Sequence, residues 1–121
     1  MPETTTPIVL IVEDDAFVRL VARDMLEDAG FDVREADTAD VALVLLEGDP
    51  GVDTLFTDID MPGSMDGIAL AARVAELWPH IHLVVTSGRI GMQDRDVPDH
   101  GRFLAKPYLQ AQLVRAIAKA A

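Results

Sequence analysis

The chain has 121 residues, of which half are apolar, so it can build one hydrophobic core but not two ordinary domains. Its net charge of −11 repels the phosphate backbone of nucleic acids, which argues against direct nucleic-acid binding. It has no cysteine and therefore no disulfide, and it shows neither a signal-peptide pattern nor an apolar run long enough to span a membrane, so we expect a cytoplasmic protein without a membrane partner.

The N-terminal part of the chain predicts a tail followed by a strand and a helix. Residues 1–7 are short and polar, and we expect a disordered or extended tail before a single domain over 8–121. The unbroken apolar run Ile8–Val12 is typical of a strand covered on both faces. Apolar residues at helical spacing predict a helix over Ala16–Ala29, and Gly30 stands where a helix commonly ends.

The same alternation continues to the end of the chain. Further strands are expected over Phe31–Ala36, Val52–Thr57, His82–Thr86 and Phe103–Ala105, and further helices from Thr38, over Asp66–Trp78 and from about Leu109. Gly88–Arg102 contains two early glycines, a proline and few large apolar residues, so we expect the fourth helix to be short or irregular. Alternating strands and helices predict an α/β fold with a doubly wound, five-stranded parallel sheet.

Polar residues follow the predicted strands at the edge where doubly wound sheets place their sites. They are Glu13, Asp14 and Asp15 after the first strand, Asp58 after the third, Thr86 and Ser87 after the fourth, and Lys106 after the fifth. Two carboxylates about 4 Å apart repel by roughly 4 kcal/mol at an effective dielectric constant of about 20, so such a group raises its own pKa values or recruits a cation. Ligands that are all oxygen suit Mg²⁺, the usual partner of phosphoryl groups.

This set of residues is suited to phosphoryl transfer. Asp58 can attack phosphorus as a carboxylate nucleophile and form an aspartyl phosphate. Lys106 supplies a compact positive charge, and the hydroxyl of Ser87 or Thr86 can donate a hydrogen bond to the product. The expected Mg²⁺ ligands are the carboxylates of Asp14, Asp58 and Glu13. We therefore interpret Asp58 as a residue placed to be phosphorylated.

Four motifs follow the strands in chain order: Glu13-Asp14, Asp58-x-x-Met61-Pro62, a hydroxyl residue before a small residue, and Lys106-Pro107. Together they resemble the CheY-like receiver domain of bacterial two-component response regulators, over essentially the whole chain. The resemblance implies a flavodoxin-like (βα)5 fold, bound Mg²⁺ and Asp58 as phosphoacceptor. The donor would be a phosphohistidine on a histidine kinase or histidine phosphotransfer protein, and the signal would pass by conformational change and protein contacts.

The resemblance also implies roles for residues around the acceptor. Asp60 would contribute its backbone carbonyl to the metal, Ser87 and Phe103 would form the conformational switch, and the Lys106–Pro107 bond would be cis. Such a receiver is not an ordinary enzyme, although it catalyses its own phosphorylation and a slow dephosphorylation. It can also dimerise when phosphorylated. The downstream protein partner is not indicated by the sequence.

Two features depart from the family pattern. The turn MPGSMDG after Asp58 is one residue longer than usual. Both Thr86 and Ser87 offer a hydroxyl, and we favour Ser87 because Gly88 follows it, with Thr86 as the alternative. Asp15 is either the cap of the first helix or an auxiliary acid near the metal.

Two other functions fit part of the sequence. Asp58-Ile59-Asp60 matches the DxD motif of haloacid-dehalogenase-like phosphohydrolases, but few residues follow it and the acidic cluster lies upstream. A receiver-shaped module that binds partners without phosphate is disfavoured because all the expected site residues are present. The chain fits equally a stand-alone regulator and a part of a larger regulator or hybrid kinase.

Overall fold

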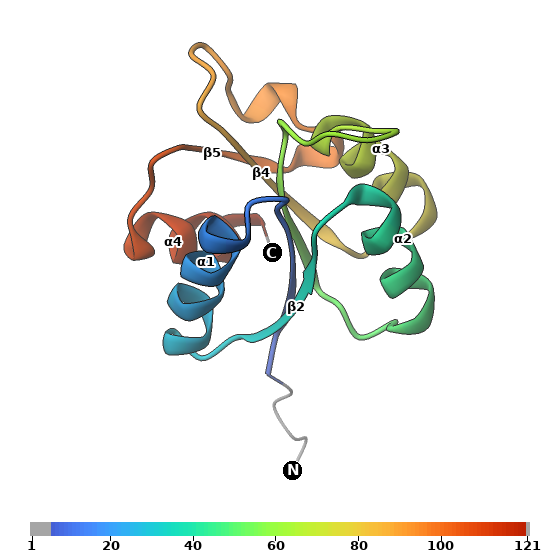
Figure 1. The fold of residues 1–121 in the computed structure, drawn as a ribbon, viewed down its shortest axis with the longest axis horizontal. Coiled ribbons are helices and arrows are strands. Elements are labelled where there is room, and N and C mark those ends of the chain that lie inside the picture. Colours follow the sequence, from blue (N-terminus) through green and yellow to red (C-terminus); the bar gives the residue numbers. More distant parts are fainter. Residues whose placement is uncertain (1–5, 121) are drawn as a thin grey trace.

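The computed structural model describes residues 6–120, which form a single parallel sheet with helices on both faces (Figure 1). The strands are β1 (Ile8–Val12), β2 (Asp32–Ala36), β3 (Thr54–Asp58), β4 (His82–Ser87) and β5 (Arg102–Ala105). Their order across the sheet is β2-β1-β3-β4-β5, and all neighbouring pairs are parallel. The order reverses at β1, which places a crevice between the carboxyl ends of β1 and β3. The predicted flavodoxin-like α/β fold is confirmed.

Within residues 6–120, four α-helices cover the two faces of the sheet. They are α1 (Ala16–Asp28), α2 (Ala39–Gly48), α3 (Gly67–Leu77) and α4 (Gln110–Ala120). In Figure 1, α1 and α4 lie on one side of the sheet and α2 and α3 on the other. None of the helices within residues 6–120 is long and apolar enough to cross a membrane.

The sheet separates two hydrophobic clusters because side chains alternate along each strand. On β1, Leu10 and Val12 belong to the larger cluster, which also contains buried residues of α2 and α3. Val9 and Ile11 belong to the smaller cluster, with residues of α1 and α4. All four side chains are almost completely buried, and burial of each contributes about 1.5–3 kcal/mol. The core therefore fixes β1 and β3, the strands that lead into the site.

Side-chain caps set the start of the helices. The Asp15 carboxylate accepts hydrogen bonds from the backbone N–H groups of Phe17 and Val18. Asp15 therefore caps α1, which is one of the two roles expected for it from the sequence. At the other end of α1, Gly30 has a φ of +96°, a conformation that favours glycine. The Phe31 N–H donates to the Leu26 carbonyl of α1, so the backbone of Phe31 is still bonded to the last turn of the helix. For this reason β2 begins at Asp32, one residue later than predicted.

The connection between β4 and β5 contains no α-helix among the described residues. Two short 3₁₀ turns, η1 (Asp94–Asp96) and η2 (Pro98–His100), take its place. Asp99 and His100 have φ values of +55° and +58°, which are incompatible with a continuing right-handed helix. The expectation of a short or irregular element is thus confirmed, and the complete (βα)5 pattern is reduced to four α-helices.

Residues 1–5 of the expected tail and Ala121 at the end of the expected domain lie outside the described residues. The last two tail residues are described, and the Pro7 carbonyl accepts a hydrogen bond from Asp32 N–H at 3.0 Å. The sheet pairing therefore begins one residue before β1.

Candidate functional site

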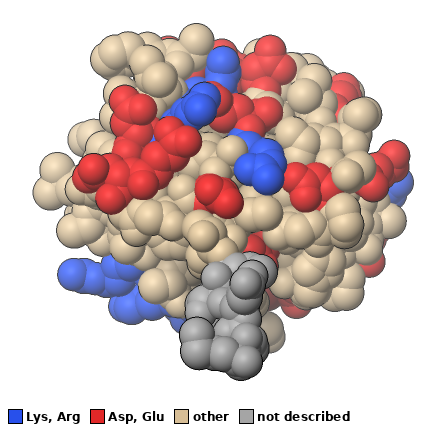
Figure 2. All heavy atoms as spheres, turned by 90° about the horizontal axis from the view of Figure 1, so that it is seen from below, with Lys and Arg blue, Asp and Glu red and all other residues tan. Residues whose placement is uncertain are grey.

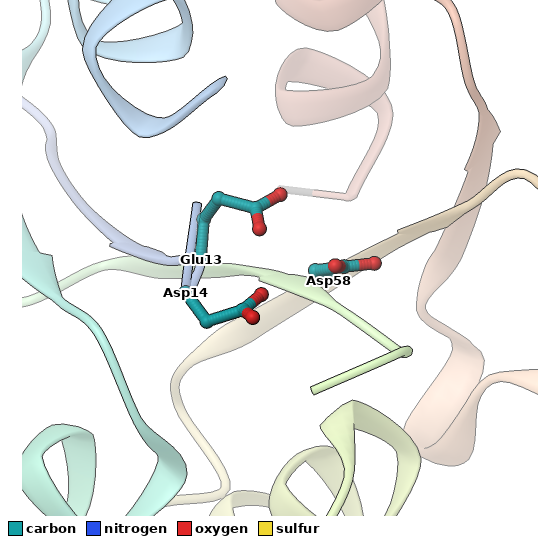
Figure 3. A group of neighbouring side chains, drawn as sticks. All are labelled: Glu13, Asp14 and Asp58. Carbon is teal, nitrogen blue, oxygen red and sulfur yellow. The ribbon is translucent and has the colours of Figure 1, made fainter. Parts of the chain in front are cut away.

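Three carboxylates converge at the carboxyl ends of β1 and β3. Glu13 and Asp14 follow β1 directly, and Asp58 is the last residue of β3. One oxygen from each lies within 4.8 Å of the others, and Figure 3 shows the three side chains directed into a common space. Glu13 and Asp58 are buried, whereas Asp14 is exposed. All three acids predicted to hold a metal are therefore together, with an opening toward solvent on the side of Asp14.

Lys106 brings a positive charge to the carboxylates from the end of β5. Its Nζ lies 3.0 Å from Glu13 Oε1 and 3.3 Å from Asp58 Oδ2. The Lys106 backbone N–H donates to the Ser87 carbonyl, which holds this segment against the end of β4. The following bond to Pro107 is cis, as the resemblance implied.

Burial and the neighbouring charges together set the ionisation of Glu13 and Lys106. Burial raises the pKa of the Glu13 carboxyl above its usual range, and hydrogen bonds from the Asp15 N–H and the Lys106 ammonium offset this effect only in part. The negative charge of Asp58 acts in the same direction as burial. For Lys106, burial alone would lower the pKa, but the hydrogen bond to Glu13 and the charges of Asp58 and Glu13 outweigh it and raise the pKa. The site thus holds a firmly protonated lysine beside carboxylates that repel each other.

The backbone around Asp58 is held closely by the start of α3. The Gly67 N–H donates to the Ile59 carbonyl at 3.0 Å, and the Thr57 hydroxyl donates to the Asp58 carbonyl at 2.9 Å. A Cβ on Gly67 would clash with the Asp58 carbonyl oxygen and lie 2.7 Å from the Asp58 carbonyl carbon. Only glycine allows this approach without a shift of the backbone. Gly67 was not among the predicted site residues. Its position directly after Asp66, the cap of α3, in the loop beyond Asp58 could have indicated a close approach of the backbone.

A second polar group lies next to the carboxylates and joins Ser87 to Asp60. The Ser87 hydroxyl donates to Asp60 Oδ2 at 2.7 Å and accepts a hydrogen bond from Arg89 N–H at 3.0 Å. The Arg89 guanidinium contacts Asp60 Oδ1 at 2.6 Å. The hydrogen bond from Ser87 is the largest cause of a lowered pKa of Asp60. The hydrogen bond and the charge of Arg89 act in the same direction, and together these effects outweigh the opposing effect of burial. The Asp60 N–H in turn donates to Asp58 Oδ1 at 3.2 Å, so this group is connected to the acceptor.

The remaining predicted residues lie in different environments. Thr86 is buried, and its hydroxyl has no hydrogen-bond partner within residues 6–120. Phe103 is partly buried and packs against the larger core cluster, and its N–H donates to Asp94 Oδ1 at 2.8 Å. Arg89 was missed by the sequence prediction, because a basic residue in a glycine-containing loop is unremarkable until its distance from Asp60 is known.

Comparison with known proteins assigns the chain to a family. The response regulator receiver domain matches residues 9–118. The chain belongs to the response regulator receiver family. The match to receivers extends over nearly the whole chain. It therefore argues against the alternative that Asp58-Ile59-Asp60 is the DxD motif of a phosphohydrolase.

Individual receivers match along most of this chain but differ in total length. The chain is 35% identical to the response regulator receiver protein CpdR of Brucella abortus, over 92% of this chain and 93% of CpdR. It is 33% identical to the C4-dicarboxylate transport transcriptional regulatory protein DctD of Rhizobium meliloti, covering 97% of this chain but 26% of that protein. A receiver protein structure from Sinorhizobium medicae superimposes with a TM-score of 0.84 at 29% identity, covering 95% of this chain and 94% of that one. Receivers of this kind therefore occur both alone and within longer proteins.

Proposed function

We propose that this receiver takes a phosphoryl group onto Asp58 from a phosphohistidine of a histidine kinase or histidine phosphotransfer protein. The observation that carries the proposal is the contact of Lys106 Nζ with both Glu13 and Asp58 beside the exposed Asp14. The proposal is supported by the sensor kinase CckA of Brucella abortus, in which a segment that makes up 12% of its length is 33% identical to this chain over 115 residues. We place the exchange in the cytoplasm, and the absence of cysteine is compatible with a reducing compartment.

In the proposed reaction, a carboxylate oxygen of Asp58 attacks the phosphorus and forms a P–O bond while the P–N bond to histidine breaks. The histidine nitrogen leaves with the bonding electron pair and takes a proton from solvent. The Lys106 ammonium compensates the negative charge of the transferring group. Hydrolysis of the product by water would return Asp58 to its carboxylate, which makes the signal transient.

The donor set fits Mg²⁺, because three carboxylates offer oxygen ligands within 4.8 Å of each other and one of them opens to solvent. Glu13, Asp14 and Asp58 would hold the ion, and Asp60 would add its backbone carbonyl. When bound, Mg²⁺ would neutralise charge on the phosphoryl oxygens. Without it, the repulsion among the carboxylates is offset by the Lys106 ammonium and by the backbone N–H groups of Asp15 and Asp60.

An apolar cavity beside Lys106 supports the proposal of a protein donor. It has a volume of about 500 Å³ and lies between α1 and the segment after β5. Its lining includes Phe17, Val21, Met25, Pro107 and Tyr108. Phe17 is 73% exposed and adjoins this apolar lining, and a contiguous exposed apolar surface is typical of an interaction site. We propose that the donor protein packs here while its phosphohistidine reaches Asp58.

We further propose that Ser87 is the switch hydroxyl, with Thr86 as the weaker alternative. In the unphosphorylated protein the Ser87 hydroxyl is engaged by Asp60, which Arg89 holds in place. To donate to a phosphoryl group on Asp58, Ser87 must leave Asp60, and Phe103 would move with the end of the sheet. Phosphorylation adds about −1.5 to −2 charges, which supplies a stronger acceptor than Asp60. The two arrangements would form a two-state switch whose populations shift on phosphorylation.

Weakening the contact between Ser87 and Asp60 should favour the active arrangement. For Asp60→Ala we expect beryllofluoride, a mimic of the phosphoryl group, to bind about threefold to tenfold more tightly in the presence of Mg²⁺. In this variant Ser87 no longer has to give up its hydrogen bond to the charged Asp60 carboxylate when beryllofluoride binds. Arg89→Ala separates this effect from simple charge removal. If only the net charge near the site matters, loss of the positive charge in Arg89→Ala should weaken beryllofluoride binding. If Arg89 acts by holding Asp60 against Ser87, the same substitution should strengthen that binding. Unchanged or weaker binding by Asp60→Ala would contradict the proposed restraint.

The raised pKa of Glu13 predicts a pH dependence of Mg²⁺ binding. Protons compete with the ion for this carboxylate, so affinity should fall as the pH decreases through the Glu13 pKa, and the fall should begin above the usual range for glutamate. Calorimetric titration with MgCl₂ between pH 5 and 8 would measure it. Glu13→Gln should bind Mg²⁺ more weakly and lose this part of the pH dependence. An identical pH profile in both proteins would show that another group is responsible.

Fluorine NMR with beryllofluoride tests the proposed function without knowledge of the donor. We expect a bound signal that requires Mg²⁺ and is lost in Asp58→Asn. Sedimentation velocity on the same samples would test for the phosphorylation-dependent dimer. A module that binds partners without phosphate would show no bound signal, and this alternative would then replace the proposal.

A further inference from the structure

Glu13 and Asp14 follow each other in the chain, yet both side chains are directed toward Asp58 (Figure 3). Within a strand, successive side chains point to opposite faces of the sheet. The chain must therefore leave the strand geometry between these two residues, and it bends at Asp14, two residues after the end of β1. The orientation of the peptide bond between Glu13 and Asp14 thus decides how two of the three carboxylates meet.

The backbone of Glu13 is held by two other elements. Its N–H donates to the Ala36 carbonyl of β2 at 3.1 Å, which continues the sheet pairing by one residue. Its carbonyl accepts a hydrogen bond at 2.8 Å from Nη1 of Arg19, on α1. Because a peptide unit is planar, a fixed Glu13 carbonyl also fixes the N–H and the Cα of Asp14. The contact with Arg19 therefore restrains the direction in which the Asp14 side chain leaves the backbone.

Arg19 is itself held in one orientation. Its Nε lies 3.2 Å from Glu35 Oε1 on β2, and the two side chains are only 21% and 29% exposed. The guanidinium is planar and carries its donors in fixed directions, so the contact with Glu35 also orients the nitrogen that reaches Glu13. The other Glu35 oxygen lies 2.6 Å from Arg23 Nη1. Arg23 and Arg19 thus both join α1 to β2, but Arg19 in addition reaches the backbone of the site.

We propose that Arg19 is a positioning residue for the metal site. It holds the peptide between Glu13 and Asp14 in the orientation that brings both carboxylates to Asp58. The inference rests on the Mg²⁺ site of the proposed function. Arg19 acts here through geometry and against its own charge, because a guanidinium near the site repels a cation.

The charge of Arg19 and its positioning have opposite effects on Mg²⁺ binding. The chain has a net charge of −11, and Figure 2 shows acidic side chains spread over the end of the molecule that lies lowest in Figure 1. In such a protein, removal of any positive charge strengthens the general attraction for Mg²⁺. Loss of charge alone therefore predicts tighter binding, whereas loss of positioning predicts weaker binding.

The test is a titration of the nitrogen-15-labelled protein with MgCl₂ at fixed pH and ionic strength, followed by NMR through the amide signals of residues 13–15 and 58–60. Arg19→Met keeps an apolar stem but loses the donors. We expect it to bind Mg²⁺ about tenfold more weakly, as is typical when a group that orients metal ligands is removed. Arg19→Lys keeps the charge and a donor but lacks the planar fork, so we expect a smaller loss.

Arg23→Met is the matched control. It removes the same charge from the same helix and an ion pair with the same Glu35, while Arg19 keeps its contacts with Glu35 and Glu13. We expect its Mg²⁺ affinity to equal or slightly exceed that of the natural protein. Both methionine variants lose an ion pair, and urea unfolding would verify that each is folded under the conditions of the titration.

A second measurement does not depend on Mg²⁺. In the metal-free protein, loss of the hydrogen bond to the Glu13 carbonyl should shift the nitrogen-15 signal of Asp14, whose nitrogen belongs to the same peptide unit. We expect this shift in Arg19→Met and not in Arg23→Met. An unchanged Asp14 signal in Arg19→Met would show that Arg19 does not position this peptide, whatever the affinity for the ion.

Two affinity results would also overturn the role of Arg19. One is Mg²⁺ binding by Arg19→Met that is as tight as in the natural protein or tighter, because charge would then be the only effect of this residue. The other is equal weakening in Arg19→Met and Arg23→Met. Failure of the natural protein itself to bind Mg²⁺ would be a different result, since it would contradict the proposed metal site and the role of Arg19 together.

Discussion

Replacing Asp58 by asparagine is expected to abolish phosphorylation of this receiver while leaving the fold intact. Asparagine has nearly the same shape but lacks the carboxylate oxygen that attacks phosphorus. Lys106 would keep its contact with Glu13 at 3.0 Å, so this partly buried lysine would not be left without a partner. After incubation with acetyl phosphate and Mg²⁺, a phosphate-affinity gel should show a shifted band for the natural protein and none for Asp58→Asn.

Asp15→Asn is the matched control for this prediction. Asp15 lies at the same edge of the sheet but caps α1 through its contacts with Phe17 and Val18, and asparagine caps helices about as well as aspartate. We expect Asp15→Asn to be phosphorylated normally. A shifted band in Asp58→Asn would mean that the acceptor is assigned to the wrong residue. Loss of the band in Asp15→Asn would mean that Asp15 acts as an auxiliary acid near the metal in addition to capping α1.

Gly67→Ala is expected to damage both stability and the site. The added Cβ would clash with the Asp58 carbonyl oxygen and lie 2.7 Å from the Asp58 carbonyl carbon and 2.8 Å from Ile59 Cα. All of these are backbone atoms, so no side chain can rotate away. Overpacking of this kind costs about 1–3 kcal/mol and sometimes more. Relief requires α3 to move away from β3, and that movement would also displace the Asp58 carboxylate from Lys106.

Gly48→Ala provides the comparison for Gly67→Ala. Gly48 is the last residue of α2, and a Cβ there would meet nothing within 4 Å. Alanine should therefore be neutral or stabilise the protein by up to about 1 kcal/mol, because it restricts the unfolded chain. Urea unfolding of the two variants would measure the difference, and acetyl phosphate labelling of the folded Gly67→Ala protein would report on Asp58. Equal stability of the two variants would contradict the close contact between α3 and β3.

The sequence predicted the fold and the carboxylates because both follow from short-range patterns. Apolar runs and turn residues located the strands, and the rule that parallel strands end at one edge brought Glu13, Asp14, Asp58 and Lys106 together. The position of these residues in the site depends only on which strand they follow and on which end of that strand they lie. Their predicted assembly was confirmed without any knowledge of side-chain conformations.

Contacts made by loop side chains could not be predicted in the same way. The contacts of Arg89 with Asp60 and of Asp94 with Phe103 depend on the path of an irregular segment. The glycines and proline of this segment predicted that no regular helix forms there, but they do not determine its path.

The most direct test of the central claim is the chemical nature of the modification. The natural protein would be incubated with acetyl phosphate, with and without Mg²⁺, and its intact mass measured before and after treatment with neutral hydroxylamine, which cleaves acyl phosphates. We predict the addition of one phosphoryl group that requires Mg²⁺ and is removed by hydroxylamine, as an aspartyl phosphate must be. An addition that resists hydroxylamine, or one that forms equally without Mg²⁺, would contradict phosphorylation of Asp58 at a magnesium site.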